Sequence, residues 1–181
     1  MRVDFTRHGE TEWNKADFIC GRTDISLTER GLMQAKELAD KLPEDIGYIL
    51  CSPLLRARQT AAACAARLGL EPVIDDRLRE WDYGDFEGLH RSAEGYMAAK
   101  LEFGVRMPNG ESVFDLAGRV YPLLRELPQR YDKNVLIVSH GGICRITEAY
   151  ARGMTREQFA DFYMGNCELR YFDTEDIWEQ K

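Results

Sequence analysis

Short apolar runs alternate along the chain with longer stretches whose apolar positions recur at helical spacing. The runs predict strands over residues 1–6, 48–51, 72–74 and 135–138, and an alternating stretch predicts a last, edge strand over 167–173. The helical spacing predicts helices over 28–42, 52–69, 112–129, 141–151 and 155–163. Because strands and helices alternate, the pattern favours an α/β fold, with helices flanking a mostly parallel central sheet.

Residues with capping preferences support several of these helix ends. Thr28 is a candidate N-cap, and Ser112 with Asp115 three residues later forms a candidate capping box. Ser52 is the candidate cap of the second helix, and Gly69 fits its C-terminal stop.

Length and composition are those of one soluble globular domain over residues 1–181. No stretch of about 18 apolar residues appears, which predicts no transmembrane helix. The charged N-terminus lacks the apolar core of a signal peptide, and the expected location is the cytoplasm. The five cysteines are dispersed and odd in number, which argues against a disulfide framework or a zinc site. The net charge of -7 argues against nucleic acid and anionic membranes as partners.

The candidate chemistry lies just after the predicted strands. His8 follows the first strand, Arg56 the second, Glu80 the third and His140 the fourth. In open α/β sheets ligands bind outside the carboxyl ends of the strands. These four distant segments are therefore expected to deliver polar groups to one crevice.

Two histidines with a carboxylate are also compatible with a metal site, but Arg7 beside His8 adds positive charge that disfavours a metal ion. Arginines instead match the oxygens of a phosphoryl group. An imidazole with one unprotonated nitrogen is then a nucleophile, and its other nitrogen is expected to donate to a carbonyl. The helix after His140 can also direct backbone amides at the anion.

The leaving alkoxide needs a proton, and Glu80 is the candidate acid. Such a glutamate must keep its proton near neutral pH, which requires a partly apolar pocket. Trp81, Tyr83 and Phe86 are the candidate walls of that pocket.

Five blocks of sequence, in order along nearly the whole chain, closely resemble the histidine phosphatase superfamily, also called phosphoglycerate mutase-like. The first block is Thr6–Asn14, with continuations at 21–24 and 27–31; the others are Ser52–Ala61, Leu78–Gly88, Asn109–Ser112 and Val138–Gly142. One Arg-His-Gly triplet is weak evidence, whereas five ordered blocks are specific.

The resemblance implies one histidine phosphatase domain of phosphoglycerate mutase-like fold, with a short lid segment at about 89–110, and a role for each matching residue. His8 is implied as the phosphorylated nucleophile and Glu80 as the general acid and base. The residues implied to surround the phosphoryl group are Arg7, Arg56 and His140, and those implied to contact substrate or phosphate are Asn14, Gly21 and Gly141. The family's hydrolysis needs no metal and no organic cofactor.

Several other residues in or near these blocks have interpretations that do not involve catalysis. Arg58 lies two residues from Arg56, so it points away on a helix and is expected at the surface, as is His90. Arg22 either orients its loop or binds substrate. The packed face of a helix is expected to hold Tyr96, Met97 and Phe103.

The favoured function is hydrolysis of a small phosphorylated metabolite, with inorganic phosphate as product. The resemblance is to the bacterial broad-specificity and α-ribazole phosphatases, without a choice between them. One alternative is a phosphoglycerate mutase, although the segment between Gly88 and Gly110 is short and has no adjacent arginine pair. The other is a catalytically silent binding protein, which should have lost one of the catalytic residues. A homodimer is conceivable through Ile177-Trp178.

Overall fold

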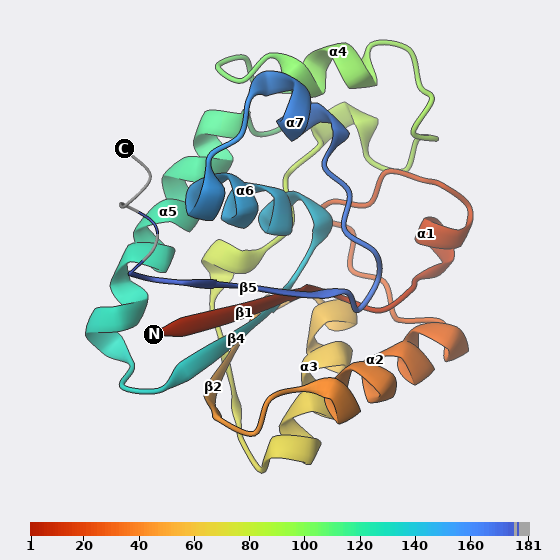
Figure 1. The fold of residues 1–181 in the computed structure, drawn as a ribbon. Helices are drawn as coiled ribbons and strands as arrows, with labels where there is room; N and C mark the ends of the chain where they lie inside the picture. The colour runs from red at the N-terminus through yellow and green to blue at the C-terminus, as the bar shows by residue number, and fades with distance from the viewer. Residues whose placement is uncertain (176, 178–181) are drawn as a thin grey trace.

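In the computed structural model, which describes residues 1–175 and 177, five strands form one sheet in the order β3-β2-β4-β1-β5 (Figure 1). The strands are β1 (Arg2–Arg7), β2 (Ile46–Cys51), β3 (Pro72–Ile74), β4 (Asn134–Ser139) and β5 (Leu169–Asp173). The first four are parallel to their neighbours, and β5 pairs antiparallel with β1 at the edge. The predicted α/β fold, mostly parallel sheet and final edge strand are confirmed.

Helices cover both faces of the sheet (Figure 1). Helices α2 (Glu29–Lys41) and α3 (Leu55–Leu68) pack together on one face, and α5 (Val113–Arg130) and α6 (Gly141–Arg152) on the other. The shorter helices are α1 (Glu12–Lys15), α4 (Tyr96–Leu101) and α7 (Arg156–Asp161), with 3-10 turns η1 (Asp76–Leu78) and η2 (Gly84–Phe86). Helices α4 and α7 contact each other beside the α6 layer.

The central strand β4 divides its side chains between two cores. Val135 and Ile137 join the apolar cluster under α5 and α6, whereas Leu136 and Val138 join the cluster under α2 and α3. This alternation follows from the period of two in a strand. All four side chains are fully buried, as the continuous apolar run indicates for a strand covered on both faces.

The predicted helix ends are confirmed at three of four places. Thr28 accepts a hydrogen bond from the Gly31 amide, Ser112 and Asp115 form the capping box, and Gly69 ends α3 with a left-handed φ of 67°. The prediction for Ser52 is wrong. Helix α3 begins at Leu55, so its N-cap position is Leu54, which has no capping side chain. The Ser52 hydroxyl accepts from the Leu54 amide at 3.3 Å and lies 2.7 Å from the His140 ring.

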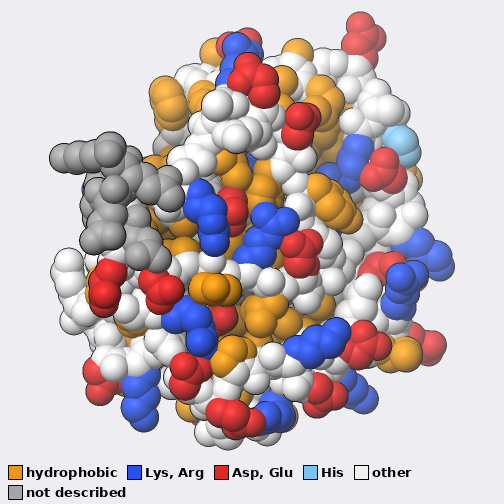
Figure 2. Space-filling view, in the orientation of Figure 1, with side chains coloured by type: hydrophobic (Ala, Val, Ile, Leu, Met, Phe, Trp, Pro, Cys, Tyr) orange, Lys and Arg blue, Asp and Glu red, His pale blue; other side chains and the backbone are white. Residues whose placement is uncertain are grey.

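Several composition-based expectations can be placed in the structure. All five cysteines are free, and four are buried as small apolar side chains. Within the described ranges no helix is long and apolar enough to span a membrane. Acidic and basic side chains are interspersed on the face shown in Figure 2. At the C-terminus Ile177 packs against the chain's own core, while Trp178 lies outside the described residues.

Candidate active site

The carboxyl ends of β1 and β4 bring the two histidines together. Arg7 pairs with Ser139 in the register of these parallel strands, so His8 and His140 leave the sheet side by side. The His8 amide donates to the Ser139 carbonyl at 2.9 Å, and the two imidazole centroids are 5.1 Å apart. The sheet topology alone thus creates the predicted crevice.

His8 is buried and held in a single tautomer. Its Nδ1 lies 2.7 Å from the Gly9 carbonyl oxygen, which can only accept, so Nδ1 carries the proton and Nε2 keeps its lone pair. Burial, then the charges of Arg56 and Arg7, hold the pKa of His8 well below its ordinary value. The ring therefore stays neutral near pH 7 with Nε2 available as a nucleophile, and the donation to a carbonyl that the sequence predicted is present.

Arg56 is completely buried beside that nitrogen. Its Nε donates to His8 Nε2 at 3.2 Å. Its two terminal nitrogens donate to the carbonyls of Thr23 at 2.8 Å and Gly21 at 2.7 Å. The loop at 21–23 therefore fixes the guanidinium against His8. Arg58, one residue beyond the buried Ala57, is exposed, as predicted.

Arg7 and His140 each have one buried nitrogen without a hydrogen-bond partner among the described residues. One terminal nitrogen of Arg7 donates to the Met164 carbonyl at 3.0 Å, while its buried Nε has no partner within the described part of the chain. His140 Nε2 lies 2.7 Å from the Ser52 hydroxyl, and its buried Nδ1 is likewise without a partner there. Burial, then the charge of Arg56, keeps the pKa of His140 well below its ordinary value.

Glu80 reaches the pocket from the segment after β3. Its carboxylate accepts from the Gly142 amide at 3.0 and 3.1 Å and from the Trp81 amide at 2.8 Å. A Cβ at position 142 would stand 2.4 Å from Glu80 Oε1, so this approach requires glycine. Trp81 and Tyr83 line the pocket beside the carboxylate, as predicted, whereas Phe86 packs behind it on Tyr96 with ring centroids 5.6 Å apart.

The structure brings most of the predicted site residues to one pocket. Its lining includes Arg7, His8, Asn14, Glu80 and Gly141. Arg56 and His140, both fully buried, lie against His8 but do not line this pocket, and neither does Gly21.

Both backbone groups of Gly21 are engaged within the protein. Its carbonyl receives Arg56, and its amide donates to the Glu87 carboxylate at 2.9 and 3.0 Å. Gly21 therefore acts here by holding Arg56. Arg22 orients the same loop, because it donates to Glu111 at 3.2 Å.

Two supporting residues gave no signal in the sequence. Asn166 donates to the His8 carbonyl at 2.9 Å and to the Asn14 side-chain oxygen at 3.2 Å, across 158 and 152 residues of sequence. Thr60 accepts the Gly9 amide at 3.0 Å from α3. Both contacts depend on tertiary folding, so no local pattern could reveal them.

The segment between β3 and α5 departs in part from expectation. Tyr96 is buried and lines the pocket, and Phe103 stacks on Phe159 with centroids 4.8 Å apart. Met97 is 48% exposed, so its predicted place on the packed face is wrong, because α4 is short and covers the pocket with only one side. His90 is exposed, as predicted.

The described residues contain no cluster of three or more His, Cys, Asp or Glu side chains arranged to hold a metal ion. The charged groups that act on both histidines are the guanidinium groups of Arg56 and Arg7.

Comparison with known proteins agrees with this geometry. A family model described as "Histidine phosphatase superfamily (branch 1)" matches residues 3–177. A putative phosphoserine phosphatase 2 of Hydrogenobacter thermophilus is 31% identical over 92% of this chain and 86% of the relative. A probable phosphoglycerate mutase GpmB of Shigella boydii is 33% identical over 98% of this chain and 87% of the relative.

Solved structures show the same fold over nearly the whole chain. A mycobacterial glucosyl-3-phosphoglycerate phosphatase, solved in complex with VO3, has a TM-score of 0.84 and 32% identity over 94% of this chain and 91% of that one. A putative alpha-ribazole-5'-P phosphatase of Escherichia coli has a TM-score of 0.82 and 30% identity, over 96% and 90% of the two chains.

Proposed function

This chain belongs to the histidine phosphatase superfamily, and from that membership we propose that it hydrolyses a small phosphomonoester through a phosphohistidine on His8. The observation that carries the proposal is the neutral His8 ring, with an unprotonated Nε2 beside the Arg56 guanidinium. An anionic phosphoryl group is attracted to that cation, and once its oxygens accept from Arg56 in place of His8, the Nε2 lone pair is free to attack phosphorus.

In the first step Nε2 of His8 attacks phosphorus, the P–N bond forms and the ester P–O bond breaks. Arg7 Nε and His140 Nδ1 are available to donate to the phosphoryl oxygens, with His140 carrying its proton on Nδ1 while the Ser52 hydroxyl donates to Nε2. Glu80 supplies the proton to the leaving oxygen.

In the second step Glu80 takes a proton from water. The oxygen of that water attacks phosphorus, which releases inorganic phosphate and restores the His8 lone pair. Asn14 and Gly141 at the pocket wall are proposed to contact the phosphate.

The proposal includes a mechanism without metal or organic cofactor, supported by the positive charges of Arg56 and Arg7 close to both histidines. It also includes a cytoplasmic location, supported by the free, mostly buried cysteines. The substrate is a small metabolite, as in the names of the phosphoserine, glucosyl-3-phosphoglycerate and alpha-ribazole phosphatases. Neither nucleic acid nor membrane is a proposed partner, and homodimer formation is left to sizing experiments.

Mutase activity is a second candidate because a relative is named as a probable phosphoglycerate mutase. Hydrolysis is favoured by the segment over 89–110. Its two arginines are engaged by carboxylates: Arg91 with Asp17 at 3.2 Å and Arg106 with Asp115 at 2.8 Å. Neither forms an adjacent pair of the kind that holds a mutase substrate.

The test is hydrolysis of p-nitrophenyl phosphate beside isomerisation of 3-phosphoglycerate, in EDTA, for wild type and His8→Ala. We expect hydrolysis without isomerisation and a loss of at least about 1,000-fold in the variant, as for other catalytic nucleophiles. Activity that EDTA removes and zinc or magnesium restores would refute the mechanism. Isomerisation stimulated by bisphosphoglycerate would identify a mutase. The absence of both activities would favour the binding-protein alternative.

A further inference from the structure

Beyond Glu80 the pocket continues to a second group of cations that phosphoryl transfer does not use. Lys100 of α4 and Arg145 of α6 line the same pocket as His8, and each is only 8% exposed. Gly142, which binds Glu80, lies three residues before Arg145 on α6, so the two share one face of the helix about 4.5 Å apart along its axis. Arg145 therefore lies next to the place where the leaving group receives its proton.

The protein leaves most of the hydrogen-bonding capacity of Arg145 unused. One terminal nitrogen donates to the Phe162 carbonyl at 2.6 Å. The other terminal nitrogen and Nε are buried without a partner among the residues the structure describes. The guanidinium carbon lies 5.2 Å from the Phe159 ring centroid, which orients the group but does not neutralise it.

Lys100 is in a similar position. Its Nζ lies 5.9 Å from the Tyr96 ring centroid. Burial, then the charges of Arg145 and Arg91, lower the pKa of Lys100 to about 7. Within residues 1–175 and 177 neither Lys100 nor Arg145 forms a salt bridge with a carboxylate. Glu80 is the carboxylate of this pocket that attracts both cations, but its oxygens accept from the Trp81 and Gly142 amides and form no ion pair with either cation. Two neighbouring buried cations that share one such carboxylate are costly to fold, so a structural role does not account for them.

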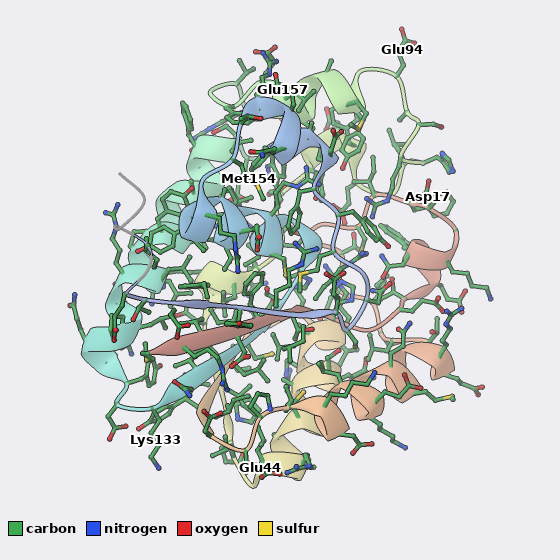
Figure 3. All side chains as sticks on the ribbon, in the orientation of Figure 1. Asp17, Glu44, Glu94, Lys133, Met154 and Glu157 are labelled. Carbon is green, nitrogen blue, oxygen red and sulfur yellow. The ribbon has the colours of Figure 1, made fainter. Side chains whose placement is uncertain are left out.

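Arg91, which lines the same pocket, differs from Lys100 and Arg145 because a carboxylate balances its charge. Arg91 pairs with Asp17 on the loop after α1, at the edge of the molecule (Figure 3). Glu94 stands farther out on the segment that leads to α4 (Figure 3). Asp17 and Glu94 thus lie at the rim, and Glu80, the carboxylate inside the pocket, forms no ion pair with Lys100 or Arg145.

We propose that Lys100 and Arg145 form a second anion subsite, so that the substrate carries another anionic group a few bonds from its phosphate ester. The proposal rests on the proposed function, because it assumes that the ester phosphate is held at His8. With phosphorus at His8 and the leaving oxygen at Glu80, the remainder of the substrate extends towards Arg145. A carboxylate or a second phosphate there would accept from both cations.

The experiment compares three esters that differ at one position: 3-phosphoglycerate, glycerol 3-phosphate and glycerol 1,3-bisphosphate. Values of kcat/KM are measured for wild type, Lys100→Met and Arg145→Gln, with exposed Lys36→Met as the matched control. We expect wild type to prefer the esters with a second anion. Each pocket variant should lose that preference by about 10- to 100-fold, the effect of one charge-assisted hydrogen bond, while the control retains it. A selective loss for 3-phosphoglycerate assigns a carboxylate, and one for the bisphosphate assigns a phosphate.

Equal kcat/KM for the three esters in wild type, or equal losses for all three in both variants, would overturn the subsite while leaving the phosphatase intact. If wild type hydrolyses no ester, p-nitrophenyl phosphate included, the proposed function has failed instead. Calorimetric titration with the phosphonate analogues of 3-phosphoglycerate and glycerol 3-phosphate then decides the subsite separately. Tighter binding of the carboxylate analogue that Lys100→Met abolishes supports it, and equal binding of the two analogues refutes it.

Discussion

The two ends of the pocket differ in how far the protein satisfies its own charged groups. At the phosphoryl end Arg56 donates to His8 and to two carbonyls, and the Glu80 carboxylate accepts from two amides. At the far end Arg145 makes one hydrogen bond and Lys100 contacts an aromatic ring. The first arrangement fixes the reacting groups before substrate arrives, as preorganised catalysis requires. The second leaves donors of Lys100 and Arg145 without an ion pair, and an anionic group of the substrate can accept from them.

The largest expected effect concerns Glu80 at the phosphoryl end. Glu80→Gln removes the transferable proton, so kcat for an alkyl ester such as glycerol 3-phosphate should fall about 100- to 1,000-fold. The aryl ester p-nitrophenyl phosphate needs less proton donation and should lose far less. Steady-state kinetics on both esters measures the difference.

Glu94→Gln is the matched control, because Glu94 is exposed on the segment before α4 (Figure 3). It should leave both rates near those of wild type. Equal losses for the two esters in Glu80→Gln would instead show that Glu80 serves the structure of the loop, through its bonds to Trp81 and Gly142.

The phosphoryl end was predictable because its residues are placed by local patterns. Each functional residue follows an apolar run that predicts a strand, and parallel strands deliver their carboxyl ends to one edge. His8 and His140 needed only the pairing of β1 with β4 to meet. The family blocks then assigned roles that the apolar pattern alone could not give, such as general acid and base for Glu80.

The far end was not predictable for a physical reason. Lys100 and Arg145 are ordinary charged residues on helical segments, where the usual expectation is a solvated side chain. Their burial follows from the packing of α4 and α7 over α6, which depends on contacts distant in sequence. The same applies to Ser52, whose contact with His140, 88 residues away, no local pattern could reveal.

An effect of intermediate size on kcat/KM is expected at Ser52, whose hydroxyl contacts His140. Ser52→Ala removes the hydroxyl 2.7 Å from His140 Nε2, which positions the ring. We expect kcat/KM to fall about 10-fold, the value of one buried hydrogen bond, and the loss to fall mainly on kcat. The exposed Ser92→Ala is the control. A fall in thermal stability without any change in kcat would assign Ser52 a purely structural role.

The smallest expected effect is a pH dependence of the free energy of unfolding, caused by Lys100 at the far end of the pocket. The pKa of Lys100 is lowered to about 7, so between pH 7.0 and 8.3 the folded protein releases this proton while the unfolded chain keeps it. Because the unfolded state then binds more protons, the stability of wild type should rise with pH, by about 1 kcal/mol over this window. Urea unfolding of Lys100→Met should lack this rise, whereas the exposed Lys36→Met should retain it. If Lys100→Met and wild type respond alike to pH, Lys100 is already compensated in the folded protein, and the contrast between the two ends of the pocket disappears.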